Sequence, residues 1–159
     1  MQTSEDMRST LANAARDAGC SSADFSLVSL HEYQAVLRQI LARFCKRGLE
    51  LLDAAWLWQH LVGPQQAIQT ERALDYLAAL LPPHERVWFI AEDWPRTKRH
   101  GNYWLYDAAV DAVLRVLGEA HAFEYYVVKR DLSWLICENH HAVVIGVGEE
   151  LVRAMRRSE

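Results

Sequence analysis

The sequence predicts an α+β fold in which N-terminal helices pack against a five-stranded, mainly antiparallel sheet. Up to about residue 81 the apolar residues recur every three or four positions, which is the period of a helix. After Pro82 and Pro83 they gather in short runs rich in β-branched and aromatic residues, which are typical of strands. With 159 residues, 51% of them hydrophobic, the chain has the size and composition of one globular domain. We therefore predict a single domain over residues 1–159, with its helical part at about 1–83 and its sheet part at about 84–159.

The helical part is expected to contain three clear helices and a weaker one before them. These helices are expected at residues 4–19, 30–47, 49–62 and 70–81. The clearest of them carries its apolar residues on one stripe, formed by Tyr33, Val36, Leu37, Ile40, Leu41, Phe44 and Cys45. Ser29 followed by Glu32 predicts a capping box at its start, and Thr70 is the expected N-cap of the last helix.

The sheet part is expected to contain five strands joined mostly by short connections. These strands are expected at residues 86–92, 102–106, 123–129, 133–137 and 142–147. A crossover helix is expected at 108–119, between the second and third strands, and a short helix at 149–157 closes the chain. If the third strand lies beside the first, every neighbouring pair is antiparallel, which predicts the order 2-1-3-4-5. We expect the helices before Pro82 to pack beside this sheet or on one of its faces.

Charge and composition exclude several classes of protein. The formal net charge is −4, from 17 basic and 21 acidic residues, and no basic arm is present, so a nucleic-acid partner is disfavoured. No apolar stretch approaches the roughly 18–20 residues that cross a bilayer, and the N-terminus lacks the pattern of a signal peptide. The three cysteines, Cys20, Cys45 and Cys137, fit reduced thiols better than a disulfide framework. We therefore expect a cytoplasmic protein without a membrane partner.

The densest polar cluster, Cys137-Glu138-Asn139-His140-His141, lies between the last two expected strands. Its groups are all possible ligands of divalent ions, but their spacing is not a known ligand pattern. On an extended backbone Glu138 and His140 point to one side, whereas Cys137, Asn139 and His141 point to the other. We therefore predict a hairpin tip with Asn139 in the turn, and no metal or cofactor. Polar contacts with a partner, a metal site, and a Cys137 nucleophile paired with a histidine are the alternatives.

A second polar cluster lies in the loop between the first two expected strands, where several cations follow an aromatic residue. Its candidate binding residues are Trp94, Arg96, Lys98, Arg99 and His100. Such a loop could bind a phosphate or an acidic protein surface, or be a solvated connection. In the order 2-1-3-4-5, this loop and the histidine hairpin fall at the same end of the sheet. They could then form one binding surface together with Glu138, Asn139, His140 and His141.

Catalytic signatures are absent from the sequence. It contains no G-x-S-x-G elbow, no P-loop, no dinucleotide-type glycine fingerprint and no H-E-x-x-H, so we assign no catalytic residue. Six tryptophans and six tyrosines instead supply the anchors that protein interfaces favour. Trp88, Trp104 and Trp134 fall inside expected strands and should be core residues, whereas Trp58 is a candidate for a partner surface.

A set of residues near the C-terminus forms a recognisable pattern. The set consists of Tyr125, Tyr126, Trp134, Leu135, Cys137, Glu138, Asn139, His140, His141 and Gly146. This pattern resembles the end of a family of small bacterial proteins of uncharacterised function. The resemblance covers about residues 86–148 and implies no particular reaction. Ala142 stands where that family usually has an acidic residue.

The size and architecture of the chain suggest an analogy with small α+β immunity proteins of bacterial toxin systems. We therefore predict a non-enzymatic protein-binding protein, an immunity protein that neutralises a cognate bacterial toxin. One alternative is an enzyme or metal-binding protein that acts at the Cys137–His141 hairpin. A second alternative is a scaffold or interaction module.

Overall fold

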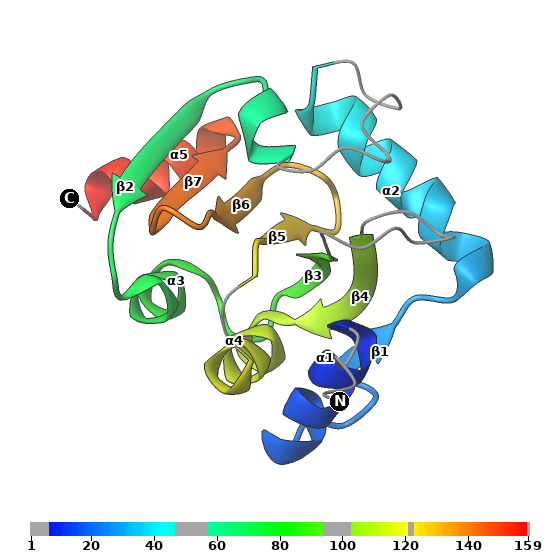
Figure 1. Cartoon of the computed structure of the whole chain (residues 1–159). Coiled ribbons are helices and arrows are strands. Elements are labelled where there is room, and N and C mark those ends of the chain that lie inside the picture. The colour runs from blue at the N-terminus through cyan, green and yellow to red at the C-terminus, as the bar shows by residue number, and fades with distance from the viewer. Residues whose placement is uncertain (1–6, 47–56, 94–102, 121–122, 159) are drawn as a thin grey trace.

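A computed structural model describes residues 7–46, 57–93, 103–120 and 123–158, and shows one seven-stranded antiparallel sheet (Figure 1). Its order is β1-β4-β3-β5-β6-β7-β2. The strands are β1 (Phe25–Leu27), β2 (Gln65–Gln69), β3 (Arg86–Glu92), β4 (Tyr103–Ala109), β5 (Tyr125–Lys129), β6 (Leu135–Glu138) and β7 (Val143–Val147). The helices are α1 (Met7–Asp17), α2 (Leu30–Phe44), the 3-10 helix η2 (Leu57–His60), α3 (Ala73–Leu80), α4 (Val110–Glu119) and α5 (Glu149–Arg157). The predicted α+β class is confirmed.

The prediction of five strands is wrong, because β1 and β2 extend the sheet at its two edges. The five expected strands form the consecutive run β4-β3-β5-β6-β7, which is the predicted order 2-1-3-4-5. β1 has three residues, and three of the five residues of β2 are glutamines. Neither segment has the β-branched or aromatic composition of a strand, so each owes its conformation to pairing with a neighbour.

Pairing of β2 with β7 also explains why α3 begins later than residue 70. The ladder runs from Gln65 opposite Val147 to Gln69 opposite Val143, and the backbone N–H of Thr70 donates to the carbonyl of Ala142. Thr70 therefore ends the strand pairing and is not the N-cap of α3, which starts at Ala73. Its hydroxyl oxygen instead accepts the N–H of Arg72 at 3.0 Å.

The remaining helices agree with the sequence in part. α2 buries the predicted stripe, but Ser29 makes no side-chain capping bond, so the capping box is wrong. Most of the helix expected at 49–62 lies outside the described residues; its described end forms η2, and Leu61 then pairs with Cys45 in an isolated bridge. α2 is the longest described helix at 15 residues, and none of the described helices could cross a bilayer.

Helices cover both faces of the sheet, which corrects the expectation that they pack beside it or on one of its faces. α1, α3, α4 and α5 pack on one face, against residues such as Phe89 and Val127. α2 and η2 cover the other face, where Ile90 and Val128 lie (Figure 1). Both faces need cover because the central strands are apolar on both sides, so alternate residues enter opposite cores.

Candidate functional site

The four buried polar residues found among the described residues all lie at one end of the sheet. Glu92, Asp93, Glu124 and Asn139 are between 2% and 6% exposed. Glu92 is the last residue of β3 and Asp93 follows it, whereas Glu124 precedes β5 and Asn139 follows β6. The backbone N–H of Glu92 donates to the carbonyl of Glu124 at 3.0 Å. Buried polar groups require hydrogen-bond partners, so this end of the sheet carries a network that the rest of the core does not need.

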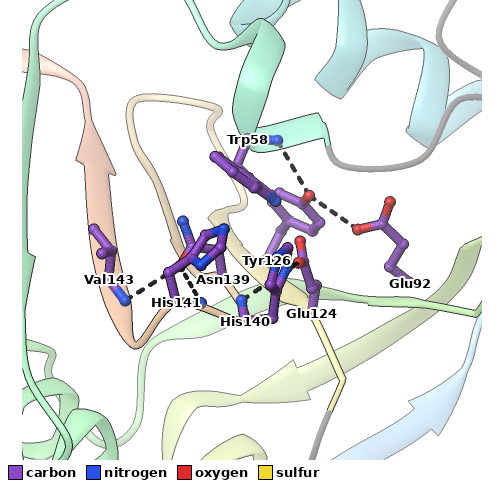
Figure 2. A network of polar contacts seen from close by, with 8 residues as sticks. All are labelled: Trp58, Glu92, Glu124, Tyr126, Asn139, His140, His141 and Val143. Carbon is purple, nitrogen blue, oxygen red and sulfur yellow. Dashed lines mark hydrogen bonds and ion pairs between the residues drawn. The ribbon is translucent and has the colours of Figure 1, made fainter.

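Tyr126 links two parts of this network (Figure 2). Its hydroxyl donates to Oε2 of Glu92 at 3.2 Å and accepts the backbone N–H of Trp58, also at 3.2 Å. Burial, and secondarily the charge of Glu92, raise the pKa of the Tyr126 phenol, so it stays protonated and can donate. Tyr126 therefore ties η2, which carries Trp58, to the end of β3.

Glu124 and His140 form the most chemically distinctive contact of the cluster. One carboxylate oxygen of Glu124, Oε1, contacts Nδ1 of the His140 ring and also accepts the backbone N–H of His140 at 3.3 Å. The Glu124 side chain is 5% exposed, whereas that of His140 is 47% exposed. A carboxylate next to Nδ1 favours the imidazole tautomer that carries its proton on Nδ1. The basic lone pair of the ring is then on Nε2. The second oxygen of Glu124, Oε2, is buried and has no hydrogen-bond partner among the described residues.

The turn between β6 and β7 is held in shape by Asn139. Its side-chain oxygen accepts the backbone N–H of His141 at 2.9 Å and that of Val143 at 3.2 Å. This is the expected Asx-type turn. The residue with left-handed backbone geometry is not Asn139 but Ala142, with φ of 58°. The tip is therefore held by several bonds, and its two histidines have a defined position.

Three aromatic rings meet above this turn. The ring centroids of His140 and His141 are 3.9 Å apart, and that of Trp58 lies 6.0 Å from His140 and 5.9 Å from His141 in edge-to-face geometry. Both histidines are exposed, whereas Trp58 is half-buried. We call Trp58, His140 and His141 the aromatic trio; Figure 2 shows it beside Glu124 and Asn139.

The turn separates two of the predicted site residues. Glu138 accepts the hydroxyl of Tyr125 at 2.8 Å and, with Tyr125, lines a cavity of about 470 Å³ on the face covered by α3 and α4. His140 lies at Glu124, on the side of Tyr126. The expectation that Glu138 and His140 point to the same side is therefore wrong, because the chain turns at Asn139 and the strand alternation ends there.

The second predicted cluster falls between β3 and β4 in the chain. Trp94, Arg96, Lys98, Arg99 and His100 lie outside the described residues. The strands on either side of them pair Glu92 with Tyr103, and this pair lies at the same end of the sheet as the histidine turn.

Several residues of the cluster are missing from the sequence-based list. Glu92, Glu124 and Tyr126 became site residues only through strand pairing. Trp58, which the sequence offered as a candidate for a partner surface, joins them through the position of η2. One signal was present: acidic residues directly end or precede apolar runs at Glu92, Asp93 and Glu124. Carboxylates at such places are candidates for burial, and buried carboxylates need partners.

The described residues include no group of three or more histidine, cysteine, aspartate or glutamate side chains placed to hold a metal ion. Cys137 is also poorly suited to act as a nucleophile. Burial, and secondarily the charge of Glu124, raise the pKa of its thiol, so the reactive thiolate is scarce at neutral pH. The geometry shows a buried carboxylate in contact with a partly exposed imidazole, beside the aromatic trio.

Thiol labelling provides a direct check of this core. We expect Cys20, which is only half-buried, to react first with an aromatic disulfide reagent at about pH 8. Cys45, whose pKa burial raises to about 12, and Cys137 should react only when the protein unfolds. A Cys20→Ser variant should lose the fast phase of the absorbance change. A fast phase that persists in this variant would contradict the packing of the two buried thiols.

Comparison with known proteins places the chain in a family. A model described as a family of unknown function (DUF6756) matches residues 3–159. The match confirms the resemblance to an uncharacterised family and extends well beyond residues 86–148. No curated protein and no solved structure matches the sequence.

Proposed function

The chain belongs to this family of unknown function, and we propose from its own geometry that it is an immunity protein, which binds and neutralises a cognate bacterial toxin in the cytoplasm. The observation that carries the proposal is the aromatic trio, fixed on a network of buried polar residues at one end of the sheet. Aromatic side chains held in place are typical anchors of protein interfaces, because little conformational entropy is lost when they bind.

The sequence supplies further candidate anchors. Trp94, Arg96 and Arg99 lie in the chain between β3 and β4, outside the described residues. Tryptophan and arginine are the residue types most enriched among interface residues with large energetic effects. The Asn139 turn supports the trio by fixing the backbone that carries both histidines.

Neutralisation can be tested with the product of the gene next to this one. We expect co-expression of this chain to relieve the toxicity of that product, and we expect the double variant His140→Ala, His141→Ala to lose the protection. Removal of two interface anchors should weaken binding by about 2 kcal/mol, or roughly 30-fold. Growth of the co-expressing strain and titration calorimetry with an inactive form of the toxin are the measurements.

Two further variants make this test specific. Arg153→Ala, at an exposed position of α5 on the other face, should protect like the unmodified chain. Trp94→Ala with Arg99→Ala tests the predicted loop in the same assay. Full protection by the double histidine variant, with its fold intact by circular dichroism, would remove the trio from the interface.

One observation favours a second candidate, an enzyme that uses His140 for acid–base chemistry. A buried carboxylate at Nδ1 of a partly exposed histidine is the arrangement by which a general base is oriented. Stoichiometry separates the two candidates. An immunity protein neutralises its toxin one to one, whereas an enzyme would inactivate an excess of it, and Glu124→Gln would then reduce the rate of inactivation.

A further inference from the structure

Two carboxylates face each other across neighbouring strands at the trio. Ile90, two residues before Glu92, and Tyr126, two residues after Glu124, enter the core covered by α2, so Glu92 and Glu124 share that face. Their backbones are joined by the bond from Glu92 to Glu124, and their relative exposures are 2% and 4%. A buried carboxylate oxygen without a donor is costly. Glu92 already accepts the hydroxyl of Tyr126, so the carboxylate that a ligand could act on is that of Glu124.

A donor and an acceptor in the same cluster have no hydrogen-bond partner among the described residues. The acceptor is Oε2 of Glu124, on a side chain that is 5% exposed, and the donor is the indole N–H of Trp58. His140 connects the two residues, because its ring contacts Glu124 and lies edge-to-face with Trp58 (Figure 2). A buried carboxylate oxygen without a partner costs free energy that a ligand can recover.

From these observations we infer that Glu124 receives the guanidinium group of an arginine side chain of the protein partner. The inference rests on the proposed function and specifies the chemistry of its partner. A guanidinium presents several N–H donors in one plane, so it can donate to Oε2 of Glu124 and pair with the charge of this carboxylate. Its flat surface also stacks on aromatic rings, which the trio provides.

Access to Glu124 runs past the trio. The side chain of His140 is 47% exposed, and His140 contacts this carboxylate through its ring and through its own backbone N–H. Rotation of the imidazole about its side-chain bonds leaves the backbone bond to Oε1 intact and opens the way to Oε2. The imidazole can then cover the inserted guanidinium. His140 is thus a positioning residue at the entrance of the arginine site.

A small probe tests this site without the partner. We expect N-acetyl-L-arginine amide at millimolar concentrations to shift the NMR signals of the Trp58 indole N–H and of the His140 ring. N-acetyl-L-citrulline amide, which has nearly the same shape but no charge, should bind at least about tenfold more weakly. This ratio corresponds to about 1.4 kcal/mol. Glu124→Gln should reduce arginine binding by a similar factor, whereas Glu138→Gln, on the other face, should leave it unchanged.

The results separate this inference from the proposed function. Equal binding of the two probes, or no shift with either, overturns the arginine site even if the chain neutralises a toxin. Charge-selective binding that Glu124→Gln abolishes supports the site even if the neighbouring gene product proves harmless. The comparison of the two probes uses the unmodified chain, so the test does not depend on whether the Glu124→Gln variant folds.

Discussion

Replacement of Gly148 by alanine is expected to destabilise the fold by about 3 kcal/mol or more. Gly148 joins β7 to α5 with φ of 113° and ψ of 139°, a conformation that residues with a Cβ rarely adopt. An added Cβ would lie 2.4 Å from the carbonyl oxygen of Ser133 and 3.1 Å from Cα of Trp134. Because both of these atoms belong to the backbone, no side-chain rotation can relieve the clash.

Gly118→Ala is the matched control for this substitution. Gly118 lies near the end of α4, and no atom lies within 4 Å of the position of an added Cβ. Alanine there should be neutral or stabilise the helix by up to about 1 kcal/mol. Urea denaturation of both variants measures the difference. In thermal unfolding, Gly148→Ala should melt roughly 6–12 °C below the unmodified chain. Similar stabilities for the two variants would contradict the backbone geometry at Gly148.

The central part of the fold could be predicted because its helices and strands follow from patterns of neighbouring residues in the sequence. The α2 stripe and the apolar run of β3 each bury a continuous pattern, and short connections fix β5, β6 and β7 as antiparallel neighbours. The edge strands could not be predicted in this way. The glutamine-rich segment of β2 is a strand only because its backbone pairs with that of β7. No pattern within the segment itself predicts this pairing.

The candidate site shows the same division between local and long-range information. The turn around Asn139 was predictable because an asparagine side chain bonds its own backbone a few residues on. The pairing of Glu92 with Glu124 depends on the register between β3 and β5. Trp58 reaches the cluster through a 3-10 helix where the pattern favours an α-helix. Both contacts are set by tertiary packing, which sequence periodicity does not encode.

Replacement of Tyr126 by phenylalanine is expected to destabilise the chain by about 3 kcal/mol, although it removes a single oxygen atom. The hydroxyl of Tyr126 is a donor to the buried Glu92 and an acceptor for the backbone N–H of Trp58. Both groups would lose this bond in the variant, and the cost is highest for the carboxylate because it can carry a charge. The variant should also loosen η2 and move Trp58, which a red shift of its fluorescence would report.

Tyr125→Phe is the internal control, because the adjacent tyrosine places its hydroxyl on the opposite face. There it donates to Glu138, which is only half-buried and can bond to water instead, so its loss should cost about 1 kcal/mol. The two variants delete the same atom from neighbouring buried residues of one strand, so most effects of packing cancel in the comparison. Urea denaturation should therefore give a difference of about 2 kcal/mol between them. If the two variants prove equally stable, the bond from Tyr126 to Glu92 does not hold the candidate site together.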